Sequence, residues 1–262
     1  MKIEAVTVCV DYADFLSRVA PHNRRLLDRW VVVTRPADEL TRQTCLKNSI
    51  EVVLCDEFGR CGDFNKARGI NAGLRQLSGD GWLVHLDGDI CLPLDFRQCL
   101  DDAHLQEGYI YGALRLCLPG WEAWEAAQRQ GLYSRALGWL AEYRDRPAGS
   151  YIGGIPGASR FGYAPIGYFQ MWHGSETLSW GSARKWYPDE HGGAGRTDNQ
   201  FAWLWDRRRR QLIPELLLFH LESLSAKDGM GHNWHGRRTP WFGPPGEEGP
   251  AGWPLAKDSN YQ

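Results

Sequence analysis

The segment 63–93 constrains this chain most. In it, a helical pattern and a short turn lead into an apolar strand over 81–86, and two aspartates follow that strand. Asp87 and Asp89 flank Gly88, which we expect to let the backbone turn and approach a ligand closely. Two carboxylates at a strand end can hold a hard divalent cation and leave coordination positions for phosphate oxygens. Ligands of open α/β sheets collect beyond the carboxyl ends of the strands. The sequence therefore predicts a metal–diphosphate site here.

The first hundred residues alternate between apolar strands and helical patterns, which predicts a doubly wound, mostly parallel α/β sheet. Strands are expected at 4–10, 30–34, 50–54 and 81–86, and helices at 12–30, 38–48 and 65–77. Further strands are expected at 109–118, 167–172 and 216–221, and further helices at 121–143 and 197–210. The segment 146–167 is rich in Gly and Pro, which predicts loops.

Composition excludes few function classes, but it bears on the partners and the compartment of the protein. The formal net charge of −2 gives no general attraction to nucleic acid or anionic membranes. Seven cysteines without a Cys-x-x-Cys pair favour buried thiols and a reducing compartment over a disulfide framework. No apolar run approaches the roughly 18 residues of a membrane span. We expect a soluble, cytoplasmic protein.

The order of these features resembles the GT-A glycosyltransferases, nearest to the family 2 type. Three motifs carry the resemblance: the first strand with Asp11, the Asn-Lys-Ala-Arg-Gly-Ile-Asn-Ala-Gly-Leu helix that starts at Asn65, and the Asp87-Gly88-Asp89 strand end. An isolated Asp-x-Asp is common, but one that follows an apolar strand shortly after such a helix is more specific. The resemblance covers about the first 100 residues and is thinner beyond residue 105.

The resemblance implies a GT-A fold, with a Rossmann-like nucleotide-binding sheet and a smaller, loop-rich acceptor-binding part. It divides the chain into a nucleotide-sugar-binding half (1–105), an acceptor-binding half (106–225) and a tail or lid rich in Gly, Pro and Trp (226–262). It also implies a divalent metal, Mn²⁺ or Mg²⁺, and a nucleoside-diphosphate sugar, with a UDP-sugar favoured.

The resemblance suggests a metal site. Asp89 resembles the direct ligand, and Asp87 resembles the residue that contacts the ribose or a metal-bound water. His220 ends a late apolar strand, where many GT-A enzymes complete the metal site, and imidazole nitrogen suits Mn²⁺. His232 and His235 are the alternative ligands. The alternative for Asp87 and Asp89 is that they are turn or cap residues, and the alternative for His220 is that it is a hydrogen-bonded core histidine.

A second group of residues is expected near the donor. By position, Asp11 and Asp38 resemble residues of the nucleoside pocket, although Asp11 could instead be the N-cap of the following helix. Lys66, Arg68 and Asn71 lie near the donor in such folds, with Arg68 facing the diphosphate. Lys66 and Arg68 could equally form a solvated helix face, and Asn71 could only fix the helix to the loop.

Inversion at an anomeric carbon requires a base that takes the acceptor hydroxyl proton. The family places a carboxylate at the start of a helix in the acceptor half, and Asp198 fits if Thr197 is the N-cap and Asp198 lies in the first turn. Asp189 and Glu190 are the rival bases. An acidic residue in a first turn is also favoured simply by the helix dipole.

Acceptor contacts are less defined. Trp172 or Trp180 could stack on a sugar ring, and core packing is an equal alternative for both. The run 207–210 consists of four arginines, typical of a solvated helix end, although it could also contact phosphates of a polymeric acceptor.

The sequence predicts a metal-dependent glycosyltransferase that moves a sugar from a nucleoside-diphosphate sugar to an acceptor hydroxyl with inversion. The acceptor could be a saccharide or glycan, a protein, or a modified DNA base. One rival is a non-catalytic sugar- or nucleic-acid-binding protein on the same fold. The other is a nucleotidyltransferase, which typically has a Gly-rich loop with a basic residue after the first strand, whereas Asp11-Tyr-Ala-Asp-Phe-Leu stands here.

Overall fold

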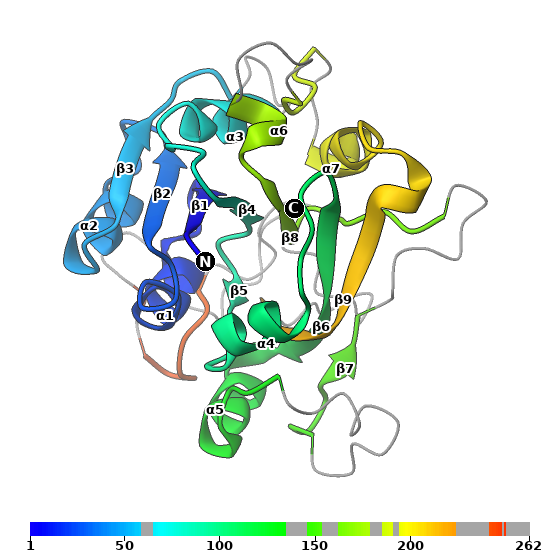
Figure 1. Ribbon diagram of the computed structural model, residues 1–262. Coiled ribbons are helices and arrows are strands. Elements are labelled where there is room, and N and C mark those ends of the chain that lie inside the picture. The colour runs from blue at the N-terminus through cyan, green and yellow to red at the C-terminus, as the bar shows by residue number, and fades with distance from the viewer. Residues whose placement is uncertain are drawn as a thin grey trace.

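A computed structural model describes residues 1–58, 65–134, 146–153, 162–178, 185–190, 194–223, 241–247 and 249. A single sheet runs through this part of the chain in the order β3-β2-β1-β4-β8-β6-β9-β5, with β7 paired to β6 (Figure 1). Its strands are β1 (Ile3–Val8), β2 (Arg29–Thr34), β3 (Glu51–Leu54), β4 (Trp82–Leu86), β5 (Ile90–Cys91), β6 (Ile110–Pro119), β7 (Tyr151–Ile152), β8 (Phe169–His173) and β9 (Arg210–Glu222).

The sheet has a parallel part and a mixed part. β1 pairs in parallel with β2 and β4, and β2 pairs in parallel with β3. β8 is antiparallel to both β4 and β6, whereas β9 is parallel to β6 and antiparallel to β5. The sequence prediction of an α/β protein with a parallel N-terminal sheet is confirmed, and the sheet continues from the first hundred residues into the second half of the chain.

Helices cover both faces, as a doubly wound fold requires. One core cluster joins the sheet to the helices α1, α2, α4 and α5, and the other joins it to α3 and α7. The helices are α1 (Ala13–Asn23), α2 (Glu39–Lys47), α3 (Lys66–Leu74), α4 (Phe96–Asp102), α5 (Gly120–Gln130), α6 (Ser175–Leu178) and α7 (Ala194–Ala202), followed by the short 3₁₀ helix η2 (Arg207–Arg209).

Several elements differ in length from their predictions. α1 ends at Asn23, two residues after Pro21, and not at Trp30 as predicted. α5 ends at Gln130, because Gly131 adopts φ +83° and closes the helix as its C-cap. β9 begins at Arg210, within the region predicted as helical, because the arginine run forms only one 3₁₀ turn before the strand. The short β5 and α4 were not predicted.

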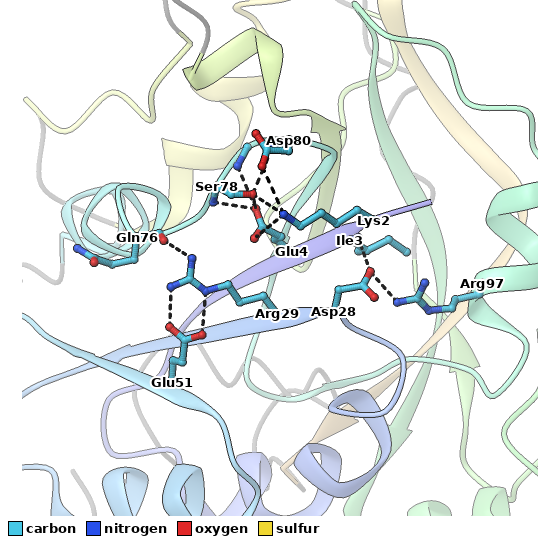
Figure 2. Close-up of polar contacts among 11 residues, drawn as sticks. Lys2, Ile3, Glu4, Asp28, Arg29, Glu51, Gln76, Ser78, Asp80 and Arg97 are labelled. Carbon is cyan, nitrogen blue, oxygen red and sulfur yellow. Dashed lines mark hydrogen bonds and ion pairs between the residues drawn. The ribbon is translucent and has the colours of Figure 1, made fainter.

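The amino-terminal ends of the parallel strands carry a network of paired charges (Figure 2). The buried Glu4 accepts hydrogen bonds through Oε2 from the Ser78 amide (2.9 Å), the Ser78 hydroxyl (2.8 Å) and the Gly79 amide (3.0 Å). Arg29 binds both carboxylate oxygens of Glu51, at 2.8 and 2.7 Å. These contacts tie the starts of β1, β2 and β3 to the turn after α3, at the edge opposite the predicted site.

Candidate active site

The carboxyl-terminal ends of β1 and β2 are joined through Asp38. Its carboxylate caps α2 by accepting from the Thr41 amide (3.1 Å), and it also accepts from the Thr34 hydroxyl (2.9 Å) and the Asp11 amide (2.8 Å). Asp11 is exposed and has a φ of 57°, and Tyr12 rather than Asp11 occupies the N-cap position of α1. Asp38 therefore shapes this loop, and Asp11 is the carboxylate that faces outward from it.

Asp87 lies at the same edge, directly after β4, and forms an ion pair with Lys66 at the start of α3. The amide of Asp87 donates to Tyr168 O (3.2 Å), and its carbonyl accepts from Ile90 (3.2 Å), which closes the turn. Gly88 does not adopt a positive φ, and a Cβ there would meet only Cys9 and Thr7 at ordinary distances of 3.6–3.7 Å. The expectation that Gly88 serves the turn is therefore wrong, because ordinary backbone angles make it, whereas its close approach to a ligand stays a prediction.

His220 is brought to Asp89 by the pairing of β5 with β9. His220 stands opposite Ile90 in that antiparallel pair, and the Leu221 amide donates to the Asp89 carbonyl at 2.9 Å. His220 Nε2 thus lies 3.4 Å from Asp89 Oδ2, and the two side chains are 10% and 9% exposed. The structure brings together, from distant parts of the sequence, the aspartate and the histidine that the sequence singled out.

Burial and neighbouring charges shift the pKa values of this group. Burial alone lowers the pKa of His220, but the Asp89 and Glu222 carboxylates outweigh it, and the pKa lies well above the ordinary value. Burial raises the pKa of Asp87; Lys66 opposes this rise and Asp89 adds to it. The raised pKa of His220 and the ion pair of Lys66 with Asp87 both reflect a concentration of carboxylates at this edge.

A second set of side chains surrounds the other nitrogen of His220. Nδ1 lies 3.0 Å from Glu222 Oε1 and 3.8 Å from Cys117 Sγ. The Tyr151 hydroxyl donates to Glu222 Oε2 at 2.6 Å. Sequence reasoning missed Glu222 and Tyr151; the only available signal was the period of two along β9, which places residues 220 and 222 on one face.

Comparison with solved structures adds the following similarities. A glucosyl-3-phosphoglycerate synthase from Mycobacterium tuberculosis, in complex with Mn²⁺, UDP-glucose and phosphoglyceric acid, is 16% identical with a TM-score of 0.47, over 80% of this chain and 68% of that one. S. aureus TarS 1–349 is 13% identical with a TM-score of 0.48, over 84% and 60% of the two chains. A mannosyl-3-phosphoglycerate synthase from Rubrobacter xylanophilus is 16% identical with a TM-score of 0.36, over 44% and 41%.

The first two of these similarities cover most of this chain, and all three are at low sequence identity. No protein-family model and no curated protein sequence matches it. Within the described residues, no helix is long and apolar enough to cross a membrane.

The N-cap and the second turn of α3 are fixed to the segment 187–189. Asn71 makes two hydrogen bonds with the backbone of Tyr187, donating at 2.8 Å and accepting at 3.1 Å. Asn65, the N-cap of α3, donates to the Asp189 carbonyl at 2.9 Å. Asn71 is buried, so it has the position of the helix-to-loop tether that the sequence left open, while Arg68 on the same helix is exposed.

Asp198 lies in the second turn of its helix, because α7 begins at Ala194. The prediction that Thr197 is the N-cap and Asp198 a first-turn residue was therefore wrong. Asp198 Oδ2 accepts from the Gly167 amide at 2.6 Å, and a Cβ at Gly167 would meet that oxygen at 3.0 Å. Of the rival bases, Asp189 is partly buried beside α3 and Glu190 is exposed.

Trp172 is fully buried on the face covered by α7. Its ring packs edge-on against Phe201, with ring centroids 4.8 Å apart, and its Nε1 donates to the Thr177 hydroxyl at 2.8 Å. This is the core-packing alternative for Trp172, and no face of the ring is free for a sugar. Trp180, His232 and His235 lie outside the described residues.

Six of the seven cysteines lie within the described residues, and all six are buried free thiols. Burial raises the pKa of Cys91, which suits a core thiol.

Proposed function

We propose that this protein is a metal-dependent glycosyltransferase that moves a sugar from a nucleoside-diphosphate sugar to an acceptor hydroxyl with inversion. The observation that carries the proposal is the meeting of Asp89 and His220 through the β5–β9 pairing, beside the Lys66–Asp87 ion pair. A buried carboxylate, an imidazole and a lysine at the carboxyl edge of a parallel sheet can hold a cation together with a diphosphate.

The residues present fit a Mn²⁺ or Mg²⁺ ion. Octahedral ligands at about 2.1 Å from a metal are about 3 Å apart, so the 3.4 Å between Asp89 Oδ2 and His220 Nε2 requires only a small adjustment. One imidazole nitrogen and carboxylate oxygens suit Mn²⁺. Asp89 and His220 would be direct ligands, and Asp87 would hold a metal-bound water or the ribose. The ion would supply positive charge for the departing diphosphate.

The chain's own groups would assist the departure of the donor phosphate. As the acceptor oxygen bonds to the anomeric carbon, the bond from that carbon to the phosphate oxygen breaks, and the diphosphate leaves with the electron pair. Lys66 and Arg68, both in the first turn of α3, would face the growing negative charge. Asp11, exposed at the end of β1, remains the candidate for a nucleoside contact, while Asp38 would act by holding the loop.

Asp198 is our candidate for the base that takes the acceptor proton. Its Oδ2 accepts from the Gly167 amide, which holds the carboxylate against the segment before β8. Asp198 and Asp87 both contribute, after burial, to the raised pKa of Tyr187, so both carboxylates act on one buried phenol. Asp189 is the alternative, because its backbone is bound to the N-cap of α3 beside Lys66.

A thermal-shift screen of UDP-, GDP-, CMP- and TDP-sugars, with and without Mn²⁺, tests donor binding. A ligand at 100 times its Kd stabilises the folded state by about 2.7 kcal/mol, so one donor should raise the melting temperature only when Mn²⁺ is present. UDP-sugars should be tested first, because the family resemblance favours a UDP-sugar donor. No shift with any donor contradicts the proposal and favours a protein that binds other ligands.

Asp198→Asn separates donor binding from transfer. The variant should keep the Mn²⁺-dependent thermal shift and lose most acceptor transfer, since general-base catalysis is worth about 10²–10⁴-fold. Asp101→Asn is the matched control, because Asp101 is an exposed carboxylate on α4, outside the candidate site. Equal loss of transfer in both variants would remove Asp198 from its role as base.

A further inference from the structure

The two nitrogens of His220 face different carboxylates. Nε2 lies 3.4 Å from Asp89 Oδ2, and Nδ1 lies 3.0 Å from Glu222 Oε1. His220 and Glu222 are two residues apart on β9, so both side chains project from the same face of the strand. Glu222 therefore contacts the Nδ1 side of the imidazole ring, whereas Asp89 lies on the Nε2 side.

Glu222 is itself held in one orientation. Its side chain is 3% exposed, and Oε2 accepts the Tyr151 hydroxyl at 2.6 Å, which leaves Oε1 for His220. Tyr151 lies on β7, paired with Cys117 of β6, and Cys117 is paired in turn with His220 of β9. Three neighbouring strands thus fix a chain of contacts from Tyr151 through Glu222 to His220.

We propose that Glu222 is a positioning residue, which keeps the proton of His220 on Nδ1 and so presents the lone pair of Nε2 to the metal beside Asp89. Histidine ligands commonly donate their second N–H to a carboxylate, which fixes the tautomer and ring orientation and raises the basicity of the ligating nitrogen. Tyr151 assists by holding the Glu222 carboxylate. This inference rests on the proposed function, because it assigns a support to the same metal site.

A competing arrangement uses the same side chains in another way. Ligand atoms of Cys117, His220 and Glu222 lie within 4.8 Å of one another and could hold a softer ion, such as Zn²⁺, on the Nδ1 side. The Tyr151 hydrogen bond favours our assignment, because it keeps the Glu222 carboxylate directed to Nδ1 as an acceptor. The two arrangements differ in whether Cys117 binds the metal.

The test measures Mn²⁺ affinity on the full chain by titration, followed by the electron paramagnetic resonance of free Mn²⁺. Glu222→Leu should weaken binding by about 10–100-fold, the usual effect of losing such a partner. Glu222→Gln keeps an oxygen that can accept from Nδ1–H and should rescue most of the affinity, and Tyr151→Phe should weaken it by less than Glu222→Leu does. Cys117→Ser should leave it unchanged.

Nitrogen-15 NMR of labelled histidine, with Mg²⁺ bound, reads the tautomer directly. We expect the His220 proton on Nδ1 in the parent protein and in Glu222→Gln, and loss of that preference in Glu222→Leu. If Glu222→Leu does not fold, Tyr151→Phe and Glu222→Gln carry the comparison.

Three outcomes would overturn the inference. Unchanged affinity in Glu222→Leu and Tyr151→Phe means that Glu222 is only structural. A thiolate-to-metal absorption band with Co²⁺ that Cys117→Ser abolishes means that the metal sits on the Nδ1 side. A parent protein that binds no Mn²⁺ removes the proposed function as well, which distinguishes that failure from the first two.

Discussion

The two edges of the parallel sheet use charge in opposite ways. At the amino-terminal edge the carboxylates are matched by donors and cations: Glu4 holds the turn at Ser78, and Glu51 binds Arg29 (Figure 2). Lys2 lies between Glu4 and Asp80. At the carboxyl-terminal edge Asp87 and Asp89 share their surroundings with Lys66, His220 and His85. Burial holds the pKa of His85 well below its ordinary value. The first arrangement stabilises the fold without a ligand, whereas the second concentrates negative charge that a cation can neutralise.

The comparison implies that substitutions at the two edges have separable effects. Changes at the amino edge should alter the free energy of unfolding and leave metal and donor binding intact. Changes at the carboxyl edge should alter binding more than stability.

Asp89→Asn should have the largest effect. The substitution keeps the size of the side chain but removes the charge that faces His220, so Mn²⁺ affinity should fall by about 100-fold or more, beyond the usual loss of a supporting residue. Mn²⁺ titration and donor turnover measure it. Asp80→Asn, at an exposed carboxylate on the other edge, is the control. Unchanged turnover in Asp89→Asn would contradict the assignment of Asp89 as a metal ligand.

Glu4→Ala should destabilise the fold by about 2 kcal/mol, because it leaves the Ser78 and Gly79 amides without their charged acceptor. Urea unfolding with an unchanged slope measures this loss. Mn²⁺ affinity of the folded variant should equal that of the parent protein. A weakened metal site in Glu4→Ala would mean that the two edges are coupled, and the comparison above would fail.

Lys66→Met should affect donor binding and metal binding differently. Lys66 is 15% exposed and paired with Asp87, so its loss removes a positive charge that would compete with a cation and help to bind a diphosphate. Donor affinity should fall about tenfold, or ~1.4 kcal/mol, whereas Mn²⁺ affinity without donor should not fall. Lys47→Met, on the exposed end of α2, is the control. Equal losses of metal and donor affinity would assign Lys66 a structural role.

The Arg29–Glu51 pair should contribute least, about 0.5 kcal/mol, because the side chains are 31% and 54% exposed. The hydrogen bond from Arg29 lowers the pKa of Glu51 despite partial burial. The contribution is therefore present above the ordinary glutamate pKa and is lost as the pH falls through the lowered value. A double-mutant cycle with Arg29→Gln and Glu51→Gln measures it, and a coupling energy that does not shrink in high salt would contradict a solvated pair.

Local patterns predicted the parallel part of the sheet well. Short apolar runs between helical patterns identify β1 to β4. The contacts within each strand–helix unit join residues that are close in sequence. Asp38, placed near the nucleoside pocket by resemblance, is also the N-cap that joins β1, β2 and α2. The meeting of Asp89 and His220 was predicted only through the family resemblance, because no local pattern reveals an antiparallel pairing between β5 and β9.

The roles of Glu222 and Tyr151 could not be predicted, since they depend on the registers of β6 with β7 and with β9. The start of α7 was misplaced for a different reason. α7 begins at Ala194 and includes Gly195, where local propensity disfavours a helix; Phe201, later in the same helix, packs against Trp172 and Tyr187. Tertiary packing here outweighs local helix propensity.

The position of β9 between β6 and β5 has a consequence for the order of events in folding. Asp87 and Asp89 can reach their places once the parallel strands assemble, but His220 arrives only when a strand from late in the chain inserts along β6. Contacts between residues so distant in sequence form slowly, because a long loop must close first. During synthesis the aspartates should therefore emerge and fold well before the histidine joins them, so high-affinity Mn²⁺ binding marks the completion of the sheet.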